Sequence, residues 1–432
     1  MALTVVVVGG LEEFHAHFVG HYPVTQLPRF AWLWVFVLLV LVTTYAVGIP
    51  DDVGSGGDAL VRAAIALGAS AGIVSVIALL AGTPLLPRFT VLTSVAFLAP
   101  IDAAVSVLAR RGQHREGEAE RVLAIVGDAE AASLAAELER SPERRALLVG
   151  SCLPADAIGA PGARPLAALV TERRASLVVL DRLAQSDDAI VAQVAELHRA
   201  GVRVRTLSLF YDEWLGKLPV GELERVSLLF DIHELHRPIY PRVKRSIDVA
   251  VAVPGVLLYL FAVPFVALVD LVANPGPLLY RQERVGKDGV EFTILKFRTM
   301  RPEAGRAGDS RWTEDDDQRL GPWGRFMRSS HLDELPQFVN VLRRDLSVIG
   351  PRPEQPRYVA ELSEKIPYYE LRHLVRPGVT GWAQVKYGYG GSELDALEKL
   401  QYEFYYLRHQ GFLLDVRIIA RTLRSIAGRT GR

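Results

Sequence analysis

The sequence has one cysteine, no surplus of charge and no HExxH pair, and each absence excludes a class of protein. With only Cys152 among 432 residues, an internal disulfide and a zinc cluster built on cysteines are both excluded. Lysine and arginine together number 49, as do aspartate and glutamate, so no net positive charge attracts nucleic acid. The ten histidines include no HExxH zinc motif. We therefore expect no nucleic-acid partner and no metal site of these two kinds.

What the sequence does have is long apolar runs near its start. Residues 30–49 carry no charge over twenty positions, which is the length that one bilayer crossing needs. Residues 63–81 form a second run and residues 89–108 a third, which Asp102 interrupts. The pattern predicts a membrane protein with an N-terminal membrane region over residues 1–111, crossing the bilayer about three times, although two crossings would also fit. Arg110 and Arg111 follow the third run, so the next residues should face the cytoplasm.

Short apolar strands alternate with helical stretches between residues 115 and 240. Strands are predicted at 122–126, 146–149, 176–180 and 202–206, and helices at about 129–139, 165–173 and 187–200. This alternation is typical of a small parallel sheet with crossover helices, a Rossmann-like α/β module. Its first turn has Gly127 but lacks the two further glycines that a dinucleotide needs. We therefore expect a structural, oligomerising or regulatory module, with homodimerisation as its simplest use.

A further apolar run lies within residues 241–277 and contains Pro254 and Pro264. Its length would suffice for a bilayer crossing. A helix broken at proline can instead enter the membrane and return to the same face. The run is therefore predicted to be a re-entrant membrane helix that breaks at these prolines. A plain fourth crossing, which would put the later residues on the other side, has the same hydropathy.

Two adjacent carboxylates, Asp333 and Glu334, lie just before Pro336. Because proline is tolerated in the first turn of a helix, this spacing predicts a helix that begins at or just before Glu334, with Asp333 at its N-cap. The unpaired N–H groups of that turn should keep Asp333 ionised, and phosphate should bind nearby. An ordinary capped surface helix would show the same local pattern.

Basic residues around this segment are candidates for phosphate contacts. Arg352 lies between Pro351 and Pro353, which restrict its backbone. A hairpin predicted from residues 281–286 and 292–300 carries Lys296 and Arg298 at its far end. Arg319 is the fourth candidate. Guanidinium groups present planar pairs of donors to phosphate, but each of these residues taken singly would also fit a solvated surface charge.

Several blocks, in order, resemble the bacterial sugar transferase family, the monotopic polyprenyl-phosphate phosphoglycosyl transferases. They lie within residues 244–432 and include KRSID, PGPLLYRQERVG, ILKFRTM, GRFMR, LDELPQFVNVL, DLSVIGPRPE and RPGVTGWAQV. The upstream part resembles the large form of the family, in which membrane helices precede a cytoplasmic Rossmann-like module. The resemblance implies that a mainly α catalytic domain over residues 278–432 follows the re-entrant helix.

The resemblance also implies a reaction. Such enzymes transfer a sugar 1-phosphate from a UDP-sugar to polyprenyl (undecaprenyl) phosphate, giving polyprenyl-diphospho-sugar and UMP through a phosphosugar on the aspartate. Asp333 and Glu334 would be the catalytic dyad and would hold Mg²⁺, a hard cation that prefers oxygen ligands. The expected place is the cytoplasmic face of the bacterial plasma (inner) membrane, in the first membrane step of exopolysaccharide, capsule or O-antigen synthesis. No motif identifies the sugar.

The sequence departs from the family pattern at a few positions, and two other hypotheses stay open. Pro264 lies about one turn later than the usual Ser-Pro break, and His331 replaces a small hydroxyl residue, so it could make the site sensitive to pH. A degenerate domain would make the chain a membrane scaffold or sensor. An oxidoreductase built on residues 121–207 is disfavoured by the missing glycines.

Overall fold

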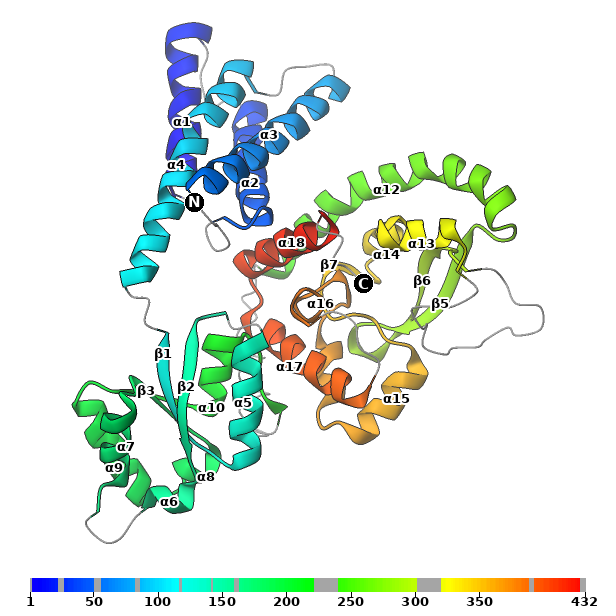
Figure 1. Cartoon of the computed structure of the whole chain (residues 1–432). Helices are drawn as coiled ribbons and strands as arrows, with labels where there is room; N and C mark the ends of the chain where they lie inside the picture. The colour runs from blue at the N-terminus through cyan, green and yellow to red at the C-terminus, as the bar shows by residue number, and fades with distance from the viewer. Residues whose placement is uncertain are drawn as a thin grey trace. The chain divides into compact units, whose positions relative to one another are not determined.

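The structure, a computed structural model, describes residues 2–21, 27–49, 56–81, 86–115, 119–140, 143–158, 163–220, 240–300, 320–387 and 392–427. The chain folds into two compact units. The first comprises Met1–Gly117 and Asp415–Thr430, and the second comprises Glu118–Leu414 with Gly431–Arg432. Figure 1 labels the helices and strands along the chain.

The first unit is helical. Its helices are α1 (Ala2–His15), which continues as the π-helical turn η1 (Ala16–Gly20), α2 (Leu27–Ala46), α3 (Gly56–Ala81), α4 (Arg88–Arg115) and most of α18 (Phe412–Ala427). The three predicted membrane runs are therefore all helices. Gly57–Leu79 of α3 and Arg88–Ser106 of α4 are long and apolar enough to cross a membrane, whereas the apolar part of α2, Phe30–Ala46, is shorter. Helix α1 was not predicted.

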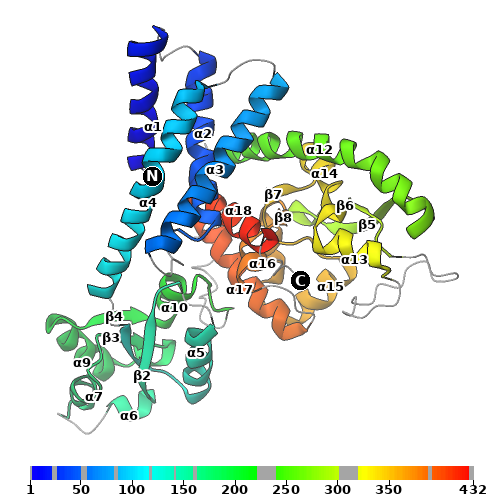
Figure 2. The same cartoon turned by 45° about the horizontal axis from the view of Figure 1, so that its top comes forward.

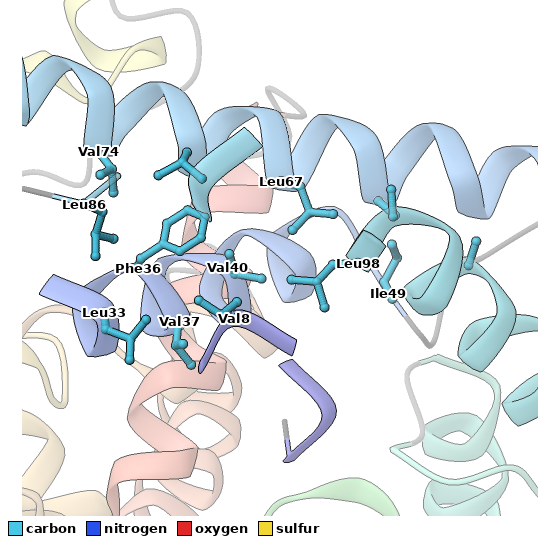
Figure 3. Close-up of a cluster of buried hydrophobic side chains, with 14 of the residues drawn as sticks. Val8, Leu33, Phe36, Val37, Val40, Ile49, Leu67, Val74, Leu86 and Leu98 are labelled. Carbon is cyan, nitrogen blue, oxygen red and sulfur yellow. The ribbon is translucent and has the colours of Figure 1, made fainter. Parts of the chain in front are cut away.

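The N-terminal helices share one apolar core (Figure 3). Val8 of α1, Phe36 of α2, Leu67 of α3 and Leu98 of α4 are fully buried in it. Arg424 of α18 donates hydrogen bonds to the carbonyls of Tyr45 (2.9 Å) and Ala46 (3.1 Å) at the C-terminus of α2. A cation there offsets the negative end of the helix dipole. Helix α18 is thus hydrogen-bonded to the C-terminal end of α2.

The α/β part of the second unit is a four-stranded sheet, as the alternating pattern predicted. Its strands are β1 (Glu120–Ile125), β2 (Ala146–Cys152), β3 (Leu177–Leu180) and β4 (Arg203–Thr206). All pair in parallel, in the order β2-β1-β3-β4. Helices α5 (Asp128–Arg140) and α10 (Leu207–Phe210) cover one face, and α7 (Pro165–Arg173) and α9 (Asp188–Arg199) cover the other. The short helices α6 (Pro154–Ile158), α8 (Arg182–Gln185) and η2 (Tyr211–Leu215) complete this part.

Helix α12 (Tyr240–Ala273) follows and is continuous over 34 residues. The predicted break at Pro254 and Pro264 is wrong: both prolines lie inside the helix, which is curved rather than interrupted (Figure 1). Proline removes one hydrogen bond and crowds the preceding turn, which bends a helix that the neighbouring packing still supports. One face of α12 leaves large apolar side chains exposed, at Leu257, Phe261, Phe265, Leu268 and Val272.

The remaining elements form the mainly α domain on which α12 packs; we call it the catalytic domain, after the resemblance described above. They are β5 (Leu279–Val285), η4 (Lys287–Gly289), β6 (Glu291–Phe297), α13 (Pro322–Ser329), η5 (Leu332–Glu334), α14 (Gln337–Arg343), β7 (Ser347–Ile349), α15 (Pro356–Lys365), η6 (Tyr369–Leu374), β8 (Gly378–Thr380), α16 (Trp382–Lys386) and α17 (Glu393–His409). Strands β5 and β6 pair antiparallel, so the predicted hairpin is confirmed. Strand β7 pairs in parallel with β8. The aromatic side chains of α17 at 402, 404 and 406 are buried core residues, one of the two roles that the sequence allowed.

Both ends of α12 are bound to this one domain. Near its start, Asp248 accepts hydrogen bonds from the Ser347 hydroxyl (2.8 Å) and the Val348 N–H (2.9 Å) of β7. Near its end, the Trp323 indole of α13 donates to Asp270 (2.9 Å). Between them, a Cβ added at Gly255 would lie 2.4 Å from the Phe338 ring. Helix α12 therefore lies against the catalytic domain along its length.

Candidate active site

Asp333 and Glu334 lie in a single 3₁₀ turn, η5, in front of α14. The turn begins after His331, whose φ of 54° is left-handed, and α14 begins only at Gln337, with Pro336 at its N-cap. The turn is closed by two bonds of the 3₁₀ type, from Glu334 N to His331 O and from Leu335 N to Leu332 O (both 3.2 Å). The predicted helix start at Glu334, with Asp333 as N-cap, is therefore wrong.

The two carboxylates have opposite electrostatic environments. Asp333 is only 8% exposed. Burial raises its pKa to about 6, and the charge of Glu334 adds to this effect, whereas Lys296, Arg328 and His331 oppose it. The expectation that an N-cap would keep Asp333 firmly ionised is therefore wrong in direction.

Glu334, in contrast, has a direct partner. The Lys296 ammonium lies 2.7 Å from its carboxylate. Burial alone would raise the pKa of Glu334, but Lys296, Arg352 and His331 outweigh burial and lower it to about 2. One carboxylate of the pair is thus fixed as an anion in an ion pair. The pKa of its neighbour Asp333, about 6, lies closer to neutral pH.

Of the four predicted basic residues, the structure brings two to the dyad. Lys296 reaches it from β6, and Arg352 reaches it from the loop between β7 and α15. The carbonyl of Arg352 accepts a hydrogen bond from Arg372 (3.0 Å), which is itself paired with Glu403 at 2.7 Å. Both members of that pair are buried. The buried Arg372–Glu403 ion pair therefore helps to hold the backbone of Arg352 in position.

Arg298 is placed differently. Its guanidinium donates to the carbonyls of Pro277 (2.7 Å), Met300 (3.0 Å) and Asn274 (2.5 Å), and to the Asn274 side chain (2.7 Å). These bonds hold the segment after α12 against the end of β6. A phosphate contact by Arg298 stays a prediction. Arg319 lies outside the described residues.

Arg328 of α13 was not among the predicted site residues. Its charge lowers the pKa of Asp333, and its Nε donates to the Thr299 hydroxyl (3.1 Å). The GRFMR block was visible in the sequence. Nothing in that pattern, however, showed that the second arginine of the block would face the dyad.

The dyad suits Mg²⁺ in its donor set. No group of three or more His, Cys, Asp or Glu side chains that could hold a metal occurs among the described residues. Mg²⁺ commonly uses only one or two carboxylates, together with waters and the phosphates of the substrate. Asp333 and Glu334 are neighbours in η5, and the charge of Glu334 adds to the effect of burial in raising the pKa of Asp333. Asp333 and Glu334 therefore fit such an ion once a phosphate is bound.

Known proteins match the part of the chain that carries this site. The family model for bacterial sugar transferases matches residues 239–429, which contain α12, the dyad and Arg352. The UDP-N-acetylgalactosamine-undecaprenyl-phosphate N-acetylgalactosaminephosphotransferase of Aeromonas hydrophila is 36% identical over 252 residues, 55% of this chain and 59% of that protein. The UDP-glucose:undecaprenyl-phosphate glucose-1-phosphate transferase of Xanthomonas campestris pv. campestris is 32% identical over 252 residues, 56% of this chain and 51% of that protein.

A shorter relative is covered more fully. The UDP-glucose:undecaprenyl-phosphate glucose-1-phosphate transferase of Caulobacter vibrioides is 37% identical over 190 residues, which are 42% of this chain and 69% of that protein. The chain spans little more than half the length of the Aeromonas and Xanthomonas proteins. The similarity to the Caulobacter protein extends over more than two thirds of it.

Proposed function

This chain belongs to the bacterial sugar transferase family, and from that premise we propose that it transfers a sugar 1-phosphate from a UDP-sugar to undecaprenyl phosphate. All three relatives described above are named for transfer of this kind. The observation that carries the proposal is the pair of adjacent carboxylates with opposite pKa shifts, surrounded by Lys296, Arg328 and Arg352. Such a site offers a nucleophile together with cations for phosphate.

In the proposed mechanism, Asp333 is the nucleophile. A carboxylate oxygen of Asp333 attacks the sugar-bearing phosphorus, the bond from that phosphorus to the bridging oxygen breaks, and UMP leaves with the electron pair. An oxygen of undecaprenyl phosphate then attacks the same phosphorus, the bond to Asp333 breaks, and the carboxylate is restored. The choice of Asp333 rests on its environment, because Glu334 is held in an ion pair with Lys296.

The neighbouring residues would place and neutralise the phosphates. Lys296, Arg328 and Arg352 lie close enough to shift the pKa values of the dyad, so they can offset the charge that gathers on the phosphate oxygens. Asp333 and Glu334 would hold Mg²⁺, which supplies further charge neutralisation when bound. Glu334 keeps Lys296 in place throughout, since it stays ionised.

The contacts of α12 support a helix that enters the membrane and leaves by the same face. A straight helix of this length would extend roughly 50 Å, more than the hydrocarbon core of a bilayer. Its two ends are hydrogen-bonded to the same domain through Asp248 and Asp270, so a crossing would require those bonds to break. The exposed apolar face of α12 would lie in the lipid. Because UDP-sugars are made in the cytoplasm, we place the catalytic domain at the cytoplasmic face of the inner membrane.

Release of UMP tests this function. The purified full-length protein in detergent or nanodiscs is incubated with Mg²⁺ and, in turn, UDP-glucose, UDP-galactose, UDP-N-acetylglucosamine and UDP-N-acetylgalactosamine. We expect UMP from at least one of them, and a lipid-linked diphospho-sugar once undecaprenyl phosphate is added. The Asp333→Asn variant should release none, while Asp288→Asn, at an exposed hairpin position, should behave as the native protein does. Absence of UMP with all four sugars would contradict the proposal.

A further inference from the structure

A cavity lies on the catalytic domain, and its lining includes neither Asp333 nor Glu334. It is bounded by α15, η6 and α17 and has a volume of about 100 Å³. Glu354, Tyr358, Tyr369, Ser392 and Lys399 are among the residues that line it. A buried water needs roughly 10–15 Å³ of such space, so the cavity has room for one planar ring and its polar substituents. The mechanism above makes no use of it.

The cavity and the dyad share a wall. That wall is the segment from Pro351 to Glu354. Arg352 in this segment lowers the pKa of Glu334 in the dyad, and Glu354, two residues later, lines the cavity. Arg284 secures the segment by donating to the carbonyl of Pro353 (2.9 Å) and lies 3.6 Å from the Glu354 carboxylate. A ligand that extends from the cavity along this segment would pass Arg352 before it meets the dyad.

The cavity also lies on the side of the domain that is remote from α12. In Figures 1 and 2 alike, α15 and α17 lie across the catalytic domain from α12. Helix α12 packs instead on α14 and β7. An occupant of the cavity would therefore arrive from water, whereas a polyprenyl chain would approach along the exposed apolar face of α12. This separation favours a soluble ligand for the cavity.

The side chains of the cavity suit a nucleoside phosphate. Tyr358 offers an aromatic ring, and ring stacking is a general way to bind a base. The Arg357 guanidinium lies 4.8 Å from the centre of this ring, and Tyr369 is buried beneath Arg372. Ser392 and Glu354 can bond to base or ribose groups, and the Lys399 ammonium can pair with phosphate. Burial lowers the pKa of Lys399 and the charge of Arg352 adds to this effect, whereas Glu354, Asp395 and Glu403 oppose it, so Lys399 lies within electrostatic range of Arg352.

We propose that this cavity binds the nucleoside of the nucleotide sugar, with Tyr358 against the base and Lys399 on the phosphate that leaves with it. This inference rests on the proposed function and deepens it. In this arrangement the phosphorus–oxygen bond of the UDP-sugar that breaks would lie between Lys399 and Asp333. The sugar and the lipid then lie on the α12 side of the dyad, and UMP can leave into water while the phosphosugar stays on Asp333.

The test measures binding of UMP and of uridine to the full-length protein in nanodiscs by isothermal titration calorimetry. Tyr358→Ala should weaken both ligands about tenfold, the size expected for one lost stacking contact. Lys399→Met should weaken UMP about tenfold and leave uridine unchanged. Tyr358→Phe keeps the ring and Lys399→Arg keeps the charge, so both should bind UMP as the native protein does. Lys287→Met, at an exposed lysine of the β5–β6 hairpin, is the matched control.

Two outcomes would overturn the inference, and they differ in what else they affect. If the native protein binds UMP and the Tyr358→Ala and Lys399→Met proteins bind it equally well, the cavity is not the nucleoside site, and the proposed function stands. If the native protein binds neither UMP nor any of the four UDP-sugars, the cavity assignment and the proposed function both fail. Thermal unfolding of each variant confirms that it is folded. If the Tyr358→Ala protein is misfolded, the binding of UMP and of uridine to the Lys399→Met protein decides the test.

Discussion

Neighbouring residues of one 3₁₀ turn, Asp333 and Glu334, have the same functional group and very different ionisation. Glu334 is bound to Lys296, while Asp333 is buried beside Glu334 and has a raised pKa. A carboxylate that is not held in an ion pair is the better nucleophile, and one that stays ionised is the better anchor for a cation. This difference in environment is the ground on which we propose Asp333 as the nucleophile.

This difference predicts an acid limb in the pH profile. Asp333 must be ionised to attack phosphorus, so UMP release at saturating UDP-sugar should fall as the pH drops through about 6. Glu334, with a pKa of about 2, should contribute nothing in this range. Lys296→Met removes a charge that lowers the pKa of both carboxylates and should move the limb to higher pH. A rate that stays flat down to pH 4.5, in protein that remains folded, would contradict the assignment.

The same pKa shift predicts a gain in stability from the inactivating substitution. Because the pKa of Asp333 is higher in the fold than its usual value of 3.8, its ionised form destabilises the folded protein, on the order of 1–3 kcal/mol at pH 7.5. Asp333→Asn removes that charge and should raise the apparent melting temperature. At pH 5 the native side chain is largely protonated, so the difference should shrink. Equal melting temperatures of the Asp333→Asn and native proteins at pH 7.5 would show that the ionised Asp333 carboxylate does not destabilise the fold.

Among the elements, α12 depends on close contact with α14. A Cβ at Gly255 would lie 2.4 Å from the ring of Phe338, which cannot retreat without disturbing the apolar cluster around Leu335 and Val266. Gly255→Ala should therefore cost about 1–3 kcal/mol of stability and lower the rate of UMP release. The second change Phe338→Leu should restore part of both.

Gly72→Ala is the matched control for that substitution. Gly72 lies in α3 and has no atom within 4 Å of an added Cβ, so alanine there should be neutral or slightly stabilising. Equal melting temperatures for the Gly255→Ala and native proteins would show that α12 and α14 do not pack as described.

Elements that are determined by a local sequence pattern were predicted well, and elements that depend on contacts with distant segments were not. The parallel sheet and the β5–β6 hairpin follow from alternating apolar residues and short turns, so they were predicted to within a few residues. The start of α14 was misplaced, because a left-handed His331 cannot be seen in a sequence. The predicted break of α12 at Pro264 failed because packing on α14 keeps the helix continuous.

The candidate site shows the same division. Asp333, Glu334, Lys296 and Arg352 were found from motifs, and the structure brings them together. Arg328 and the raised pKa of Asp333 depend on the folding of distant segments onto one another, which no local pattern reveals.

At the scale of the whole molecule, a buried lysine joins the α/β module to the catalytic domain. Lys217 is 1% exposed and lies 2.6 Å from Glu137 of α5 and 2.5 Å from Glu398 of α17. Lys217→Met would leave two partly buried carboxylates without their cation, at a cost of up to about 3–5 kcal/mol. We expect limited proteolysis to cleave between the two domains faster in this variant. The triple change Lys217→Met, Glu137→Gln and Glu398→Gln should recover much of the loss, and an unchanged cleavage rate in Lys217→Met would argue against a tight interface.

Membrane topology is a second prediction at this scale, and the single cysteine makes it accessible. In a Cys152→Ser background, Lys244→Cys and Leu278→Cys place one thiol at each end of α12. A maleimide that cannot cross membranes should label both positions in inside-out vesicles and neither in intact spheroplasts. Labelling of the two positions from opposite sides would identify α12 as a bilayer crossing and contradict the re-entrant arrangement.

The most direct measurement of the central claim is intact-protein mass spectrometry after incubation with the UDP-sugar that releases UMP, with no lipid present. The account predicts a mass increase of one phosphosugar, located by peptide mapping on Asp333, absent from the Asp333→Asn protein and lost when undecaprenyl phosphate is added. An adduct on another residue, or UMP release that requires undecaprenyl phosphate from the start, would contradict it.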